Sequence, residues 1–80
     1  MNIEREFFLK DFYCIYYLYD KDTIVYIGKT KRPADRLMQH AKSDKIFNSI
    51  SIQYCHKDEI TKTEIRLINK YRPKYNKGWK

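Results

Sequence analysis

One glutamate near the C-terminus stands among the apolar residues of a predicted helix. The apolar residues that share one helix face within residues 58–71 are Ile60, Leu67, Ile68 and Tyr71. Steps of about 100° per residue place Glu64 inside this face, between Ile60 and Ile68. A carboxylate pressed toward a core has to be paired, protonated or bound to a metal ion, because leaving it bare costs several kcal/mol. A glutamate at the edge of the face, reaching solvent or a lysine, is the alternative interpretation.

A second group of candidate residues lies where a predicted strand runs into a basic loop. In TIVYIGKTKRP, residues 23–33, the β-branched and aromatic residues favour a strand up to Ile27, and we expect Gly28 to end it. Pro33 suits the first turn of a helix. The cations at this corner are Lys29, Lys31, Arg32 and Arg36. A strand-to-helix corner exposes backbone amides beside these cations, and a phosphate group binds readily to such a place.

One carboxylate beside several cations and tyrosines suits the hydrolysis of a phosphodiester bond. This reaction needs a deprotonated nucleophile, stabilisation of charge on the phosphorus oxygens and help for the leaving oxygen. A divalent ion held by one carboxylate can supply the last two, since Mg²⁺ commonly keeps water or phosphate as its remaining ligands. A tyrosine beside cations can have its pKa lowered enough to accept a proton.

Two neighbouring segments are predicted to form a β-hairpin that positions the tyrosines. FYCIYYLYD, residues 12–20, is apolar or aromatic until its last residue, which predicts a central strand covered on both faces. IVYIG, residues 24–28, is the expected second strand. A three-residue loop over residues 21–23 puts Tyr16 and Tyr26 on one face. A two-residue loop separates them, because a slip of one residue inverts the pleat.

Three further elements follow along the chain. ADRLMQHAK, residues 34–42, predicts a short helix, and the apolar stripe of this helix consists of Ala34, Leu37, Met38 and Ala41. Arg36 and His40 are one turn apart on the other side of this helix. SISIQYC, residues 49–55, alternates like a half-buried third strand. Pro73 is expected to end the helix of residues 58–71 and to precede an irregular tail.

Length and charge indicate one small domain with an anionic partner. The 80 residues, taken as a single domain over 1–80, carry 17 basic and 10 acidic side chains and a net charge of +7. Nucleic acid is the first candidate partner and a membrane surface the second. The longest apolar run, residues 12–19, is shorter than the roughly 20 residues that cross a bilayer. The N-terminus lacks the features of a signal peptide, so we expect a soluble intracellular protein without a membrane partner.

The two cysteines, Cys14 and Cys55, lie in apolar segments that resemble strands. They have no close pairing and no neighbouring histidines of the kind that form a zinc site. Buried reduced thiols are therefore the favoured interpretation.

The order of these motifs resembles the GIY-YIG nuclease family. CIYYLYDKDTIVYIGKT, residues 14–30, is similar to the two tripeptides that name the family, with CIY in place of GIY and an intact YIG. Arg36 and His40 follow at the distances usual in the family, and EIRLINKYRPKYN, residues 64–76, resembles its segment with a metal-binding glutamate and a closing asparagine. The resemblance covers residues 11–77. It implies an α+β fold with a small three-stranded antiparallel sheet flanked by helices.

The resemblance also implies catalytic roles for four residues. Tyr26 would act as general base or orient the attacking water. Arg36 would stabilise charge on the phosphate, and Glu64 would hold one divalent ion. Tyr16 would support Tyr26 or contact the scissile phosphate.

Further roles follow for residues around this centre. Lys29 would lower a tyrosine pKa, His40 would assist proton transfer, and Asn76 would brace the site by hydrogen bonding. Contacts with nucleic acid are expected from Lys29, Lys31, Arg32 and Asn76. Taken singly, each residue also has an ordinary structural explanation, as a sheet aromatic, a surface charge, a helix-surface histidine or a turn asparagine.

The sequence therefore predicts an endonuclease that uses Mg²⁺, with Mn²⁺ as a substitute, to cut DNA by a one-metal mechanism. RNA is an alternative substrate. Target selection is expected to come from a homodimer or from a separate targeting protein. The competing prediction is a catalytically inactive module of the same fold that binds nucleic acid or a partner. Cys14 stands where the family has glycine and is expected to narrow the site or repack it slightly.

Overall fold

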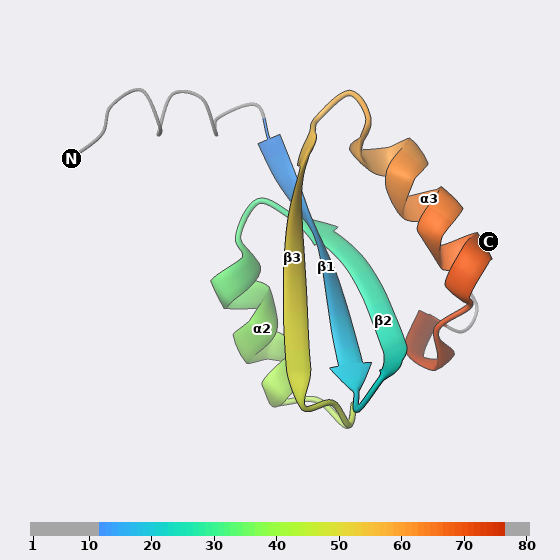
Figure 1. Cartoon of the computed structure of the whole chain (residues 1–80). Coiled ribbons are helices and arrows are strands. Elements are labelled where there is room, and N and C mark those ends of the chain that lie inside the picture. The colour runs from blue at the N-terminus through green and yellow to red at the C-terminus, as the bar shows by residue number, and fades with distance from the viewer. Residues whose placement is uncertain (1–11, 77–80) are drawn as a thin grey trace.

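Three antiparallel strands form one sheet in the order β2-β1-β3 (Figure 1). The structure is a computed structural model that describes residues 12–76. The central strand, β1 (Phe12–Asp20), pairs on one side with β2 (Thr23–Thr30) and on the other with β3 (Ser49–His56). An unbroken apolar and aromatic run gives β1 side chains to bury on both faces, which suits a central strand. The predicted three-stranded antiparallel sheet is confirmed.

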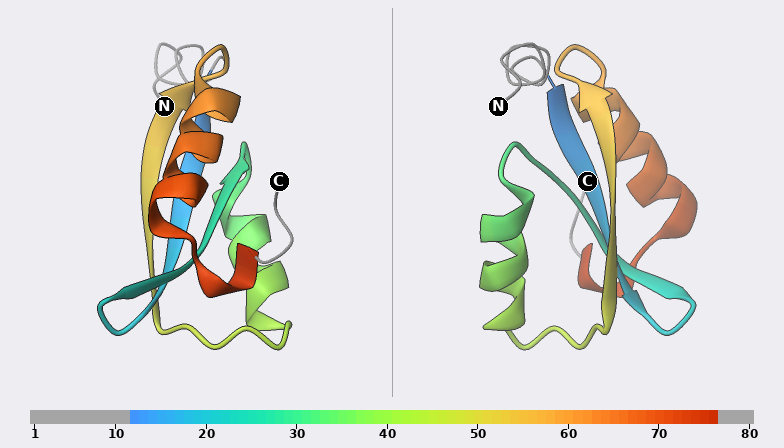
Figure 2. Two further views of the ribbon diagram at one scale, coloured as in Figure 1. Left: turned by 90° about the vertical axis from the view of Figure 1, so that its right-hand side faces the viewer. Right: turned by 60° about the vertical axis from the view of Figure 1, so that its left-hand side comes forward.

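One helix covers each face of the sheet. Helix α2 (Pro33–Ala41) lies on one side and α3 (Ile60–Tyr71) on the other, and the short 3-10 helix η1 (Lys74–Asn76) follows α3 (Figures 1 and 2). Pro33 occupies the first turn of α2, as predicted. Within residues 12–76, neither helix has the length and apolar character needed to cross a bilayer.

Helix α3 ends in a left-handed residue. Arg72 has φ 46° and ψ 57°, and its backbone N–H donates to the carbonyl of Ile68 at 2.8 Å. This conformation closes the last helical turn, and Pro73 follows directly. The predicted end of the helix is confirmed, whereas its start at Ile60 is two residues later than expected.

The sheet separates two hydrophobic clusters. On the α3 side the buried residues are Ile15, Ile27, Ile60, Leu67 and Ile68. On the α2 side they are Tyr16, Leu18 and Val25, with Phe47 and Ile50 packed against them. Cys14 is buried and Cys55 is half-buried, and both thiols are free, as predicted. Burial raises the pKa of the Cys14 thiol, which keeps it protonated and inert.

The hairpin turn has a loop of two residues. Asp20 pairs with Thr23, so only residues 21–22 form the loop, and Lys21 adopts a φ of 59° there. Primed two-residue turns match the twist of the strands that they join, and they require such positive φ values. Of the two loop lengths considered from the sequence, the structure has the two-residue loop.

A β-bulge nevertheless puts the two tyrosines on the same face. Leu18 pairs with Tyr26, whereas its neighbour Tyr19 pairs with Ile24, so β2 contains one extra residue opposite this step. Beyond the bulge, β1 and β2 pair in the register that a three-residue loop would give. Tyr16 and Tyr26 consequently lie on the α2 side of the sheet.

Helix α2 is turned differently from its predicted orientation. Met38 of the expected apolar stripe is 60% exposed, and His40, expected on the other side, is the buried residue of the helix. This helix contacts the sheet through a polar interaction, the hydrogen bond between the His40 ring and Tyr16. Helical periodicity records apolar spacing and contains no information about such a partner.

Candidate active site

Three rings from three elements meet on the α2 side of the sheet. Tyr16 comes from β1, Tyr26 from β2 and His40 from α2. The ring centroids of Tyr26 and His40 are 4.8 Å apart, and Tyr16 lies 5.6 Å from His40 and 6.0 Å from Tyr26. The Tyr16 Oη is 2.9 Å from His40 Nε2. The structure thus brings together three residues that are up to 24 positions apart in the chain.

Burial fixes the protonation of the Tyr16 and His40 pair. Desolvation, followed by the neighbouring Tyr26, raises the pKa of Tyr16 well above its usual range, so its hydroxyl keeps its proton. Desolvation lowers the pKa of His40, and the cations Lys45 and Arg36 lower it further. The 2.9 Å contact is therefore a hydrogen bond between a neutral hydroxyl and a neutral imidazole.

Gly28 provides the space in which the Tyr16 ring lies. The two residues are direct cross-strand partners, and a Cβ on Gly28 would stand 2.8 Å from Tyr16 Cε1 and closer still to Cζ and Oη. A side chain on Gly28 would therefore displace the ring. The expectation that Gly28 ends the strand is wrong, because β2 continues to Thr30. This glycine is needed for a close approach between neighbouring strands.

Glu64 is buried on α3, as its place in the apolar stripe predicts. Its residue exposure is 7%, and its Oε1 lies 3.9 Å from Lys29 Nζ. The Lys29 ammonium also donates to Thr61 Oγ1 at 2.8 Å. Desolvation raises the pKa of Glu64, and Lys29 opposes that rise. The carboxylate is thus both withdrawn from water and close to a lysine, so it combines features of the two sequence interpretations.

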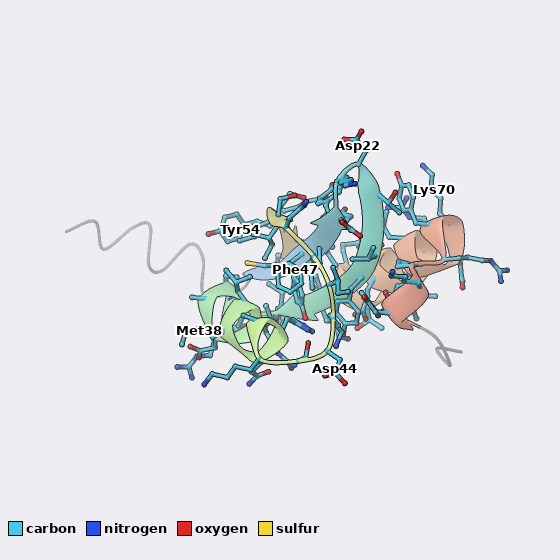
Figure 3. The ribbon with its side chains drawn as sticks, turned by 90° about the horizontal axis from the view of Figure 1, so that it is seen from below. Asp22, Met38, Asp44, Phe47, Tyr54 and Lys70 are labelled. Atoms are coloured by element: carbon cyan, nitrogen blue, oxygen red, sulfur yellow. The ribbon has the colours of Figure 1, made fainter. Side chains whose placement is uncertain are left out.

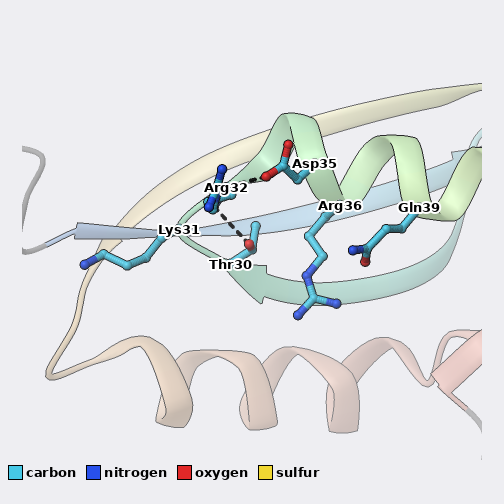
Figure 4. A pocket seen from close by; sticks show the side chains of 6 residues that line it. All are labelled: Thr30, Lys31, Arg32, Asp35, Arg36 and Gln39. Atoms are coloured by element: carbon cyan, nitrogen blue, oxygen red, sulfur yellow. Dashed lines mark hydrogen bonds and ion pairs between the residues drawn. The ribbon is translucent and has the colours of Figure 1, made fainter.

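Arg36 and Glu64 approach the same tyrosine from opposite helices. Both influence the pKa of Tyr16, Arg36 lowering it and Glu64 raising it. The Arg36 side chain extends from α2 toward α3 (Figure 4). Three of the five residues predicted as catalytic, Tyr16, Tyr26 and His40, thus meet at one point on the α2 side of the sheet, and Arg36 and Glu64 act on Tyr16 electrostatically from the two helices.

A cationic pocket of about 320 Å³ adjoins this point at the start of α2 (Figure 4). The residues that line it are Thr30, Lys31, Arg32, Asp35, Arg36 and Gln39. Arg32 is partly neutralised there, because its Nε lies 2.7 Å from Asp35 Oδ2. Of the four cations predicted to bind phosphate, three line the pocket, whereas Lys29 points to Glu64 on the other side. Lys29 lies within β2, whereas the other three cations follow the end of this strand, in the loop and in helix α2.

Asn76 braces the outer edge of β2. Its Oδ1 accepts the Ile27 backbone N–H at 2.9 Å, and its Nδ2 donates to the Ile27 carbonyl at 3.0 Å. The side-chain amide thereby takes the place of a neighbouring strand. Contact between Asn76 and nucleic acid stays a prediction.

The sequence did not point to Lys45 or to Thr61. Lys45 lies in the irregular segment before β3, and its Nζ is 5.2 Å from the centroid of the Tyr26 ring. No local pattern in that segment indicates this contact. Thr61 holds Lys29 beside Glu64, and its spacing of three residues from Glu64 on a helix could have indicated a shared face.

The donor set suits a hard divalent ion rather than zinc. Within residues 12–76 there is no cluster of three or more histidine, cysteine, aspartate or glutamate side chains. Structural zinc needs four such ligands, whereas Mg²⁺ is commonly held by one or two carboxylates together with water and phosphate. Glu64, a buried carboxylate with Lys29 beside it, fits the second case.

Comparison with known proteins gave one family and two solved structures. The model of the GIY-YIG catalytic domain matches residues 12–76. The magnesium-bound GIY-YIG N-terminal endonuclease domain of UvrC from Thermotoga maritima is 27% identical, covers 95% of this chain and 99% of its own, and has a TM-score of 0.68. A tyrosine-to-phenylalanine mutant of that domain, bound to its catalytic divalent cation, is 27% identical, with 95% and 98% coverage and a TM-score of 0.66. The search of curated proteins found no significant match.

Proposed function

The chain belongs to the GIY-YIG family, and from this membership we propose that it is a divalent-metal-dependent endonuclease that hydrolyses DNA phosphodiester bonds with one metal ion. The observation that carries the proposal is the convergence on Tyr16, where His40 hydrogen-bonds to the hydroxyl while Arg36 and Glu64 act on it electrostatically.

The two tyrosines take different roles in this mechanism. Tyr16 keeps its proton and is held by a hydrogen bond with His40, so it serves as a fixed support. Tyr26 is the tyrosine left to accept a proton from the attacking water or to orient it. Its ring packs against His40, so a proton released there has a neutral imidazole beside it.

The phosphate is held by cations and the metal by a carboxylate. Arg36 is exposed beside the pocket and can pair with two phosphate oxygens at once. Glu64 would hold Mg²⁺, or Mn²⁺ in its place, and Lys29 helps to keep that carboxylate ionised. When bound, the metal supplies charge stabilisation at the phosphate and at the leaving oxygen.

DNA is the proposed substrate because a net charge of +7 accompanies the cationic pocket next to the candidate site. RNA is the alternative substrate. We propose that the protein acts inside the cell and that a second copy or a separate targeting protein selects the target.

One observation favours a second function. The contact between Lys29 and Glu64 could be a structural ion pair in a catalytically inactive module that binds nucleic acid. In that case Glu64 would stabilise the fold and would bind no metal.

Glu64→Gln separates the two functions, because it removes the charge while retaining the shape. The wild type, Glu64→Gln and the matched control Glu59→Gln, an exposed glutamate just before α3, are incubated with plasmid, hairpin, flap, single-stranded and RNA substrates in Mg²⁺ or Mn²⁺. We expect Glu64→Gln to lose about 100-fold or more of the cleavage rate while it still binds DNA, and Glu59→Gln to cut normally.

Thermal melting with and without Mg²⁺ completes this experiment. A metal-binding Glu64 predicts a Gln variant that melts at or above the wild-type temperature in metal-free buffer and is no longer stabilised by Mg²⁺. A Gln variant that melts several degrees lower in metal-free buffer and still cuts would sink the catalytic assignment.

A further inference from the structure

The two outer edges of the sheet differ in whether another part of the described chain hydrogen-bonds to their backbone. At the β2 edge, the Asn76 amide hydrogen-bonds to the backbone of Ile27 on both its N–H and its carbonyl. At the β3 edge, no strand within residues 12–76 pairs with the outer side. A strand edge of this kind presents backbone donors and acceptors to another strand.

Strand β3 also lacks the features that usually keep an edge from pairing. Its eight residues, SISIQYCH, include no lysine, arginine, aspartate, glutamate or proline, although the chain as a whole has 27 charged side chains. Its pairing with β1 runs from Ser49 to His56 without a register shift, so no bulge bends the strand away. As far as the described part of the chain extends, the edge over residues 49–55 is therefore regular, uncharged and open to pairing.

Exposed apolar side chains adjoin this edge on the α2 side. Ile52 is 47% and Tyr54 is 56% exposed, and they lie opposite Tyr16 and Cys14 of β1, which places them on that face of the sheet. Met38 of α2 is 60% exposed and lies on the same side of the molecule as Tyr54 (Figure 3). We call Ile52, Tyr54 and Met38 the β3 patch. Apolar groups beside an open strand edge add a hydrophobic contribution to strand pairing.

We propose that β3 is the interface of a homodimer, in which two copies pair their β3 strands antiparallel across a two-fold axis. The product is a continuous sheet with three strands from each copy. Pairing Ile52 with its own equivalent places Ile50 opposite Tyr54 of the partner and keeps these apolar residues on one face. A register shifted by one residue would put them on opposite faces, so the pattern excludes such a shift.

Charge favours a second copy as the occupant of this edge. Two copies that each carry +7 repel one another wherever their basic surfaces meet. An uncharged strand is a place where they can approach without like charges opposite each other. An anionic partner, in contrast, would be drawn to the cationic pocket at α2.

The size of the interface predicts a weak dimer. One eight-residue strand and a few apolar side chains from each copy bury less than the roughly 1,200 Å² of a standard complex. The dissociation constant should therefore be on the order of 1–100 μM. This inference rests on the sheet edge and not on the proposed chemistry, so either can fail without the other.

Sedimentation of the full chain over a concentration series tests the proposal. We expect the mass to rise from 9.9 kDa toward twice that value as the concentration passes through the range of about 1–100 μM. Ile52→Lys puts a charge into the paired strand and should weaken association at least ~10-fold. Ile65→Lys is the matched control, because it adds the same charge at a partly exposed isoleucine on α3, away from the edge.

Both variants are first checked by thermal melting, and Tyr54→Lys replaces Ile52→Lys if the latter does not fold. A monomer at every concentration overturns the proposal, whichever other molecule covers the edge. It is also overturned by a dimer that Ile52→Lys leaves intact, or by one that Ile65→Lys weakens to the same extent.

Discussion

Gly28→Ala should damage the site through one methyl group, although alanine is tolerated in most strands. The new Cβ would stand 2.8 Å from Tyr16 Cε1 and nearer to Cζ and Oη, so the ring has to move. The ring has little room to do so, because Tyr16 is 2% exposed and packs against Tyr26 and His40. The backbone of Gly28 is not left-handed, so the effect is purely steric.

The expected cost can be worked out from these contacts. Overpacking of a core typically costs about 1–3 kcal/mol. Displacing the ring also breaks the 2.9 Å hydrogen bond between Tyr16 and His40, which contributes a net ~1 kcal/mol. Alanine recovers roughly 0.5–1 kcal/mol, because glycine is unfavourable within a strand. The sum is a destabilisation of about 2 kcal/mol, which lowers the melting temperature of a domain of this size by about 8–16 °C.

A double-mutant cycle tests whether the ring is the cause. Gly28→Ala is measured by thermal and urea unfolding in the wild type and in a Tyr16→Val background, where the ring is absent. We expect the alanine to be neutral or stabilising in that background, since only the strand preference then acts. The reasoning is refuted if Gly28→Ala melts within about 2 °C of the wild type, or if it costs the same in both backgrounds.

Three other measurements examine the pH response, the β2 edge and the pocket. Folding lowers the pKa of His40 below its ordinary value of 6.5, so the unfolded chain binds a proton first, and stability present above pH 6.5 should be lost as the pH falls below it. His40→Gln should remove that part of the pH dependence in urea melts, and an unchanged profile would contradict this. Asn76→Ala should lower the free energy of unfolding by about 1–3 kcal/mol, because the two hydrogen bonds to β2 are lost, and an unchanged urea midpoint would show that the brace contributes nothing. Lys31→Ala should weaken DNA binding for all sequences and reduce the salt slope by about 1, with turnover of bound DNA unchanged. Arg32→Ala should weaken DNA binding less than Lys31→Ala, because Arg32 is already paired with the Asp35 carboxylate. Equal losses of affinity in the two variants would show that the Arg32–Asp35 ion pair breaks without a free-energy cost when DNA binds.

The sequence predicts well the features that depend on local patterns. The apolar run of residues 12–20 indicated a central strand, and β1 occupies that position. The helical spacing around Glu64 predicted its burial, because periodicity places a residue on a face whatever its chemical type. The fold class followed from the same patterns, supported by the resemblance to a family.

The features that the sequence did not predict depend on contacts between distant residues. The orientation of α2 follows from the bond between Tyr16 and His40, which are 24 positions apart, and apolar spacing therefore suggested the wrong face. The role of Gly28 depends on a ring from the neighbouring strand. A two-residue loop followed by a bulge gives the same strand register beyond it as a three-residue loop, so the sequence pattern did not distinguish the two. The contact of Lys45 with Tyr26 comes from an irregular segment without periodicity.

Helix α2 is anchored to the sheet through a residue of the candidate site itself. His40 is the only buried residue of this helix, which also carries Arg36. Local unfolding of α2 should therefore need much less free energy than opening of the sheet, and its amides should exchange with solvent sooner than those of β1. Replacing His40 would lower that opening energy further and would move Arg36 away from its position. An inactive His40 variant would thus have two defects at once, a missing imidazole and a detached helix, and amide hydrogen exchange across α2 distinguishes them.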